Sequence, residues 1–196
     1  WSGDRALLVS CGAAHELDSV LVLNVRGDGA TRRYERFWFP YKGLVVDPLP
    51  ADPGHVLFAS VYVGEAAAGL QVHRVPISDR RTLSRYRLGR ATALDRSVRA
   101  GRQWLVDASG AIRAAISSRD EHPVLLHGRD GKFDEVLSLE DTDAFQPLAL
   151  SADGELIYGI SEQGREQRDL VEFDPQARRI TRTLFSRPLV DVQGAL

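Results

Sequence analysis

The chain contains 196 residues, of which 43% are hydrophobic and 27% are charged, and its formal net charge is -2. This composition provides enough apolar side chains for a buried core and excludes a disordered chain. The small negative charge argues against a general nucleic-acid binder, and no apolar run approaches the roughly 18 residues needed to cross a bilayer. We therefore expect one globular domain with no nucleic-acid or membrane partner.

The counts of methionine and cysteine narrow the expectation further. The chain has no methionine and begins with Trp1, so we expect a processed or excised piece of a longer protein, whose compartment (cytoplasm or periplasm) the sequence leaves open. The single cysteine, Cys11, excludes an intrachain disulfide and a multi-cysteine zinc site, because both need partner cysteines. We expect Cys11 to be a small buried apolar side chain.

Strands separated by glycine and proline turns dominate the first half of the chain. Residues 19–25 are apolar at both alternating sets of positions, as expected of a strand between two packed layers. No amphipathic helix is predicted. In chain order, the segments expected to carry strands are residues 2–10, 20–25, 33–39, 43–47, 52–60, 70–75 and 83–88.

The second half continues the same pattern. Polar turns such as Asp174-Pro-Gln-Ala177 join consecutive strands into β-hairpins. In the first half, Arg26-Gly-Asp28 spells an adhesion tripeptide, but Gly and Asp are what a hairpin turn requires there. The further segments expected to carry strands are residues 103–106, 109–117, 124–127, 133–139, 145–150, 153–161, 170–173 and 180–185.

One sequence motif, called here the repeated phrase, recurs four times, about every 50 residues. It consists of a glycine turn followed by an apolar strand that ends in serine. A hairpin follows each copy, and an apolar strand precedes the second, third and fourth. Four-stranded antiparallel units at this spacing are the sequence signature of a β-propeller. The sequence therefore predicts an all-β fold, a propeller of about four blades. The four serines are Ser10, Ser60, Ser117 and Ser161, and the approximate blades are 1–42, 43–92, 93–141 and 142–188.

Two features of this architecture stay open at the level of sequence. A β-sandwich or barrel is the competing fold, although neither requires a phrase to return four times. Both chain ends look truncated, with residues 189–196 starting a further element, so we expect an open arc of a larger propeller. An open arc leaves strand edges uncovered, and such edges promote self-association.

Several phrases resemble one family. Residues 104–116, 122–126, 145–158 and 168–175, together with 43–57, resemble the propeller domain of prolyl-oligopeptidase-type (S9) serine peptidases, which include acylaminoacyl and dipeptidyl peptidases. The resemblance covers roughly residues 43–196. It implies that an α/β-hydrolase domain with a Ser, Asp and His triad follows in the same parent chain, and that the propeller caps it and restricts access to short peptide substrates.

The resemblance transfers no catalytic residue to this chain. The segment Gly159-Ile-Ser-Glu-Gln-Gly164 has one residue too many for a Gly-x-Ser-x-Gly nucleophile elbow, and its Ser161 matches the other strand-ending serines. Some members of the family hold the substrate amino terminus with paired glutamates, and no adjacent pair occurs here, which weakens a dipeptidyl-peptidase assignment. We predict no catalytic, cofactor-binding or metal-binding residue.

Other candidates have simpler explanations. His122 and His127 are five apart, so on a strand they point to opposite faces and cannot share a metal. The acidic run 140–143 lacks the carboxylate spacing of a calcium loop. Arginine supplies all basic residues except Lys42 and Lys132, from a GC-rich coding bias or to hold peptide carboxylates around a channel. The remaining histidines are His15, His55 and His73, and the arginines near strand ends are Arg99, Arg102, Arg165 and Arg168.

Two functional hypotheses follow. The first is a non-catalytic propeller portion of a serine peptidase whose parent acts through a covalent serine intermediate. The alternative is a free-standing propeller that serves as a protein-binding scaffold. A propeller enzyme with a channel metal is disfavoured because the chain has few candidate ligands that converge, with Asn24 its only asparagine.

Overall fold

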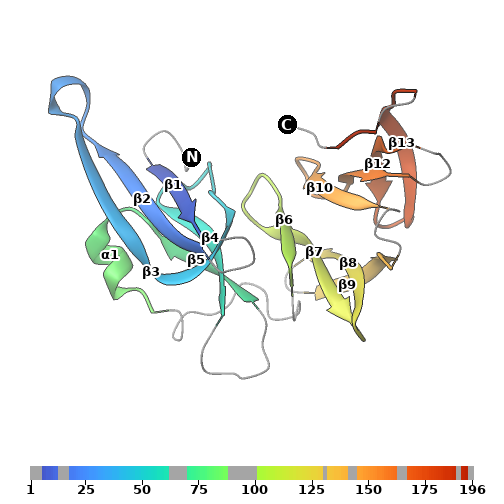
Figure 1. Ribbon diagram of the computed structural model, residues 1–196, viewed down its shortest axis with the longest axis horizontal. Coiled ribbons are helices and arrows are strands. Elements are labelled where there is room, and N and C mark those ends of the chain that lie inside the picture. The colour runs from blue at the N-terminus through green and yellow to red at the C-terminus, as the bar shows by residue number, and fades with distance from the viewer. Residues whose placement is uncertain are drawn as a thin grey trace. The chain divides into compact units, whose positions relative to one another are not determined.

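The computed structural model describes residues 6–12, 18–61, 70–87, 101–129, 132–140, 145–162, 167–188 and 191–193. These residues form antiparallel strands and two short helices, and the chain divides into two compact units, Trp1–Arg99 and Ala100–Leu196 (Figure 1). The all-β fold class predicted from the sequence is confirmed. Among the described residues, no helix has the length and apolar character needed to cross a membrane.

The unit Trp1–Arg99 carries five strands that neighbour one another in chain order. Its long third strand is shared, because residues up to Gly43 pair with the second strand and Leu44, Val45 and Asp47 pair with the fourth. The predicted strands 33–39 and 43–47 thus form one continuous strand. The five are β1 (Ala6–Cys11), β2 (Asp18–Arg26), β3 (Arg33–Asp47), β4 (His55–Val61) and β5 (Leu70–Pro76).

Glycine permits the change of partner along β3. A Cβ on Gly43 would collide with the carbonyl oxygen of Ala59 and lie 2.6 Å from the Phe58 ring, so β4 approaches the bare backbone there. The predicted turn between β2 and β3 contains Gly27 and Gly29, both with positive φ. It also contains the 3-10 helix η1 (Gly29–Thr31).

The predicted strand 83–88 is wrong. Residues Arg80–Arg85 form the helix α1, which begins after Asp79. The Asp79 carboxylate accepts hydrogen bonds from the backbone N–H and the hydroxyl of Thr82, both at 2.8 Å. Such N-capping stabilises a first helical turn. A helix this short buries one apolar side chain, Leu83, and therefore leaves no 3.6-residue periodicity in the sequence.

The core of the first unit combines alternate positions of its strands. Along β2, Val20 and Val22 are fully buried, whereas Leu21 between them belongs to the other face. The Asn24 side chain is also buried and donates hydrogen bonds to the carbonyls of Ile77 and Ser78, at 2.9 and 3.0 Å. The apolar core cluster comprises Ala6, Val20, Val22, Phe37, Phe39, Val56, Phe58, Val75, Ile77 and Leu83.

The unit Ala100–Leu196 consists of two four-stranded antiparallel sheets, each with its strands in chain order. This meander is the blade topology of a β-propeller. The first sheet contains β6 (Gln103–Val106), β7 (Ile112–Arg119), β8 (His122–Arg129) and β9 (Lys132–Ser138), and the second β10 (Gln146–Leu150), β11 (Ile157–Ser161), β12 (Asp169–Asp174) and β13 (Arg179–Phe185). The blade boundaries expected above stay predictions.

The two sheets of this second unit share one core. Leu105, Ala114 and Leu125 of the first sheet belong to the same buried cluster as Ile157 and Phe173 of the second. Within the second sheet, the Phe145 ring lies 5.2 Å from that of Phe173, and a Cβ on Gly159 would come within 2.6 Å of Phe145. Because apolar side chains of both sheets belong to one buried cluster, apolar stacking holds the sheets together, as it does neighbouring blades.

The cysteine expectation is corrected by the structure. Cys11 is exposed rather than buried, because it is the last residue of β1, which pairs with a neighbour on one side only.

Candidate functional site

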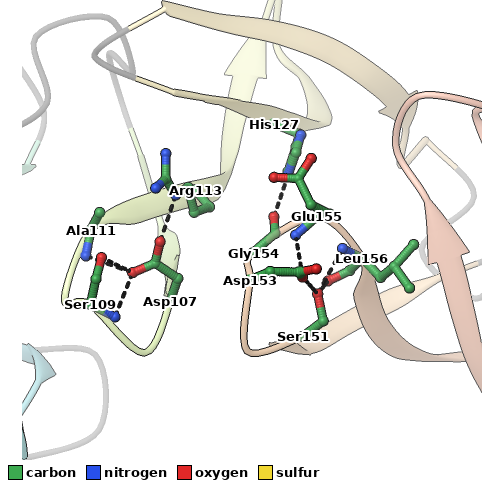
Figure 2. Close-up of polar contacts among 10 residues, drawn as sticks. All are labelled: Asp107, Ser109, Ala111, Arg113, His127, Ser151, Asp153, Gly154, Glu155 and Leu156. Carbon is green, nitrogen blue, oxygen red and sulfur yellow. Dashed lines mark hydrogen bonds and ion pairs between the residues drawn. The ribbon is translucent and has the colours of Figure 1, made fainter.

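The densest polar cluster that Figure 2 shows lies in the turns before β7 and β11. In the first turn, Asp107 is only 8% exposed. One of its carboxylate oxygens accepts hydrogen bonds from the backbone N–H of Ser109 (2.9 Å), the Ser109 hydroxyl (2.5 Å) and the N–H of Ala111 (3.0 Å). The other oxygen accepts the Arg113 Nε–H at 2.6 Å. Four donors thus converge on one carboxylate.

These donors determine the charge of Asp107. Burial by itself raises the pKa of a carboxyl group, but here the hydrogen bonds from the Ser109 hydroxyl, the Arg113 guanidinium and the backbone outweigh it and lower the pKa of Asp107 to about 2. Asp107 is therefore ionised at neutral pH and paired with Arg113. A carboxylate so fully occupied by donors has no oxygen positioned to act as a general base.

The second turn has a similar hydrogen-bonding arrangement, but the aspartate and the serine exchange positions. Ser151 stands where the first turn has Asp107, and its hydroxyl donates to the Asp153 carboxylate at 2.6 Å and accepts the Leu156 N–H at 2.9 Å. Gly154, like Gly110 in the first turn, has positive φ. Glycine adopts this conformation without the strain that other residues incur.

The two turns are in direct contact. A Cβ on Gly154 would lie 2.8 Å from Cγ of Arg113 and 3.3 Å from Cβ of Asp107. The Gly154 carbonyl accepts a hydrogen bond from Nε2 of His127, on β8, at 2.8 Å (Figure 2). We call Asp107, Arg113, His127 and Gly154 the turn cluster. It joins the two sheets of the second unit, and what it can do chemically is hold them in register.

Ser161, the serine of the segment that imperfectly matches a nucleophile elbow, is a buried strand residue. It is 3% exposed and ends β11, opposite Asp169 of β12. Ser60 and Ser117 are equally buried but do not end their strands, because β4 continues to Val61 and β7 to Arg119. The Ser60 hydroxyl donates to the Lys42 carbonyl at 2.8 Å. The repeat thus places a buried hydroxyl at this point in three copies, while Ser10 in the first copy is exposed.

The histidines occupy separate surroundings. His55 contacts the Asp52 carboxylate, whose pKa is lowered mainly by its hydrogen bond with Arg74, and the exposed His122 pairs with Glu140 at 2.9 Å. His15 lies outside the described residues. Within the described ranges, His, Cys, Asp and Glu side chains do not gather into a group of three or more that could hold a metal ion.

His73 differs from the others. It is 1% exposed on β5, opposite Phe58 of β4, and neither ring nitrogen has a hydrogen-bond partner. Burial lowers the pKa of His73, since a charged imidazole would be poorly solvated there. No sequence pattern marks this histidine, because His73 occupies a core-facing position of an otherwise ordinary strand.

The remaining sequence candidates are distributed over the surface. Arg168 pairs with Glu162 at 2.6 Å, and Arg102 is exposed. Arg99 and Arg165 lie outside the described residues, as does most of the acidic run 140–143. Within the adhesion-like tripeptide, Gly27 has φ of +69° and Asp28 accepts the Thr31 N–H through its carbonyl, so the tripeptide is part of a turn.

Sequence reasoning recognised both turns of the cluster but not their contact. The aligned segments Asp107-Ala-Ser-Gly110 and Ser151-Ala-Asp-Gly154 predicted equivalent turns. Arg113 and His127 carried no comparable signal, because their partners are far apart in sequence. The hint in the sequence is that Arg113 is a charged residue near the start of an apolar strand, six residues after Asp107.

Together, the repeated turns and the stacked four-stranded sheets define a chain of the β-propeller type. No family model matches the sequence, and no curated protein does. Among solved structures, the chain is similar to TolB from Acinetobacter baumannii, with a TM-score of 0.47 and 13% sequence identity. The match covers 90% of this chain and 40% of the TolB chain, so this chain spans less than half of that structure's length.

Proposed function

We propose that the chain is the non-catalytic propeller portion of a serine peptidase of the prolyl oligopeptidase type, which caps a hydrolase domain and restricts it to short peptides. The observation that carries the proposal is the turn cluster, in which His127 of the first sheet bonds to the Gly154 carbonyl of the second, and Asp107 pairs with Arg113. A cap must keep its blades closed to exclude large substrates. The cluster provides that closure without a reactive group.

The resemblance to that family supports the same proposal. Two of the segments that carry it, residues 104–116 and 145–158, contribute to the first two strands of the two sheets in the second unit. They include Asp107, Gly154 and the aromatic contact of Phe145. Two of the segments that resemble the family thus supply Asp107 and Gly154, whose turns touch where one sheet meets the next, and a cap requires such contacts between its sheets.

The parent polypeptide that contains this chain tests the proposal. A fluorophosphonate probe is expected to label a serine beyond residue 196, and Ser161→Ala is expected to leave that labelling unchanged. The parent should cleave short peptides and spare a long unfolded protein, and Asp107→Ala should weaken this discrimination by loosening the sheets. Loss of labelling in Ser161→Ala, or a labelled parent that cleaves both substrate sizes equally, would contradict the proposal.

A second candidate function is a propeller that serves as a binding scaffold without a hydrolase partner. The observation that favours it is an open groove on the first unit, beside the exposed Trp38. A parent polypeptide in which fluorophosphonate labels no serine, but which binds peptides through that groove, would favour the scaffold over the cap.

A further inference from the structure

The outer face of the β2–β3 hairpin carries exposed aromatic side chains. Tyr34 is 70% and Trp38 is 56% exposed, and Arg36 lies between them on the same face of β3, because alternate strand residues share a face. Across the hairpin, Trp38 pairs with Leu21 and Arg36 pairs with Leu23. Large apolar side chains that are exposed together indicate a binding surface more often than scattered ones do.

An open groove lies beside these residues. Its volume is about 390 Å³, and its walls are formed by Leu21, Arg36, Phe37, Trp38 and Arg80. Arg80 is the first residue of α1, so the groove lies between the hairpin and the start of the helix. It combines an indole ring with two guanidinium groups, one from the strand and one from the helix.

The two arginines of the groove are unpaired. Within the described ranges, neither the Arg36 nor the Arg80 side chain forms a hydrogen bond or ion pair, and the nearest acidic residues in the sequence are engaged elsewhere. Glu35 pairs with Arg26, and Asp79 caps the helix through Thr82. Arg74, Arg113, Arg119, Arg168 and Arg182 by contrast all pair with carboxylates of this chain. The groove is therefore cationic.

The strand edge at the groove is also available. Residues 33–38 of β3 pair with β2, and β4 begins to pair with β3 only at Leu44. No other described strand lies beside this part of β3. An exposed edge accepts an extended peptide through main-chain hydrogen bonds, while neighbouring pockets select its side chains.

From these features we propose that the groove binds an extended peptide segment that carries a carboxylate next to an apolar side chain. Guanidinium groups form charge-assisted, often bidentate, hydrogen bonds with carboxylates. The carboxylate contacts Arg36 and Arg80, and the apolar side chain lies on the Trp38 ring, where its burial supplies affinity. The proposal is independent of the proposed function, because the groove neither includes nor requires a hydrolase domain.

Two other occupants fit the groove less well. A second copy of the chain docking through the same groove would bring two pairs of unpaired arginines together, and like charges oppose such contact. A single-stranded nucleic acid would stack on Trp38 and Tyr34, but such binding needs a positive groove that tracks many phosphates. This groove offers two cations, in a chain whose net charge is -2.

Fluorescence anisotropy with a labelled peptide tests the proposal on the purified chain. The probe is the capped peptide Gly-Ser-Glu-Leu-Asp-Leu-Gly, and its counterpart has Gln and Asn in place of the two acidic residues. The acidic probe is expected to bind with a Kd at least about tenfold lower than the neutral one, and affinity is expected to fall with added salt. Arg36→Gln and Arg80→Gln should each raise the Kd about fivefold to tenfold, and Trp38→Ala should do so at least as strongly.

Matched variants distinguish binding by the two groove arginines from nonspecific attraction to positive charge. Arg81→Gln removes the same charge from the next residue of α1, and Arg33→Gln does so on the opposite face of β3; both are expected to leave the Kd within about twofold. Far-UV circular dichroism and the melting temperature establish that each variant is folded. All of the substituted side chains are exposed, so folding should be preserved.

Each other result overturns the proposal. Equal affinity for the acidic and neutral probes, or equal losses in the groove and control variants, would show that the groove does not select a carboxylate. Tighter binding of a labelled oligothymidine than of the acidic probe would assign the groove to nucleic acid. If Trp38→Ala changed the sedimentation coefficient of the chain but not its affinity for the probe, the occupant would be a second copy.

Discussion

In the unit Ala100–Leu196, each copy of the repeated phrase lies in a four-stranded sheet of its own, whereas in the unit Trp1–Arg99 the strand β3 serves two strand sets and a helix follows β5. The second unit joins its sheets through the hydrogen bond from His127 to the Gly154 carbonyl and through a shared apolar core. The first unit buries Asn24 and an unpaired His73. A repeated phrase thus fixes the local strand, while the contacts around it decide how sheets are joined.

The largest expected effect is at the turn cluster. Asp107→Ala leaves the Arg113 guanidinium, whose side chain is 18% exposed, without its carboxylate and frees three further donors. Breaking a buried pair from one side costs about 3 kcal/mol. The expected result is a loss of that size in the free energy of unfolding, measured by urea denaturation at pH 7.

The equivalent residue of the second turn is the control. Asp153 is exposed and accepts bonds from Ser151 and Glu155, so Asp153→Ala should cost about 1 kcal/mol or less. Because the pKa of Asp107 is lowered to about 2, its contribution is complete above pH 4 and disappears as the pH falls toward 2. Equal losses for the two variants at pH 7 would mean that the pair with Arg113 contributes nothing.

The elements that the sequence predicted well are those whose signal is local. The repeated strands β4, β7 and β11, and the hairpins that follow β7 and β11, were predicted from apolar alternation and glycine turns, which are signals that span only a few residues. The helix α1 did not, because its only buried apolar residue, Leu83, also fits a strand. Its one helix signal, Asp79 followed by Thr82, is a cap that also occurs in turns.

Sites made by distant residues were the least predictable. Nothing in the sequence connects His127 to Gly154, or Arg80 to Trp38, because each pair meets only once the strands are in register. Ser161 is the opposite case, because the local repeat already indicated a strand-ending serine rather than a nucleophile elbow, and it lies buried at the end of β11. Local patterns therefore predicted the sheets, whereas the turn cluster and the groove required the fold.

A smaller loss is expected at Gly154, where the two sheets of the second unit touch. Gly154→Ala combines a positive φ with a Cβ only 2.8 Å from Arg113, so the arginine must shift away from Asp107. We expect a loss of about 2 kcal/mol, from backbone strain together with the weakened pair. Urea denaturation measures it.

Gly29, in the other unit, provides a control in which alanine introduces backbone strain without crowding a neighbour. It has φ of +53° with nothing within 4 Å of a built Cβ, so Gly29→Ala carries the strain alone and should cost about 1 kcal/mol. If the two alanine variants lost equal stability, crowding by Arg113 would be negligible and the turn cluster would be looser than its geometry implies.

In the first unit, His73 should make the free energy of unfolding depend on pH below about 6.5, whereas the contribution of Asp107 in the second unit changes only below pH 4. Burial lowers the pKa of His73 below its ordinary value, so the unfolded chain takes up the proton first as the pH falls. The stability associated with neutral His73 is thus present above about pH 6.5 and is lost below it. The free energy of unfolding of wild type relative to His73→Leu should fall by about 1 kcal/mol between pH 7 and pH 5.5. His122→Gln, at an exposed site, should show no such change; a similar slope in both variants would remove His73 as the cause.

The smallest expected effect concerns the helix α1, which forms where the sequence predicted the strand 83–88. Asp79→Ala removes the acceptor for the Thr82 N–H and hydroxyl, while Leu83 keeps its place in the core. Because the cap is exposed and the buried leucine holds the helix, we expect local fraying rather than global unfolding. Amide hydrogen exchange of residues 80–85 should accelerate, while exchange in β2 and β4 stays unchanged.

Asp28→Ala is the matched comparison, since Asp28 precedes η1 without a side-chain cap bond and should leave exchange in η1 unaltered. If Asp79→Ala accelerated exchange across β4 as well, the helix would be an integral part of the first unit's core rather than an element added at its edge.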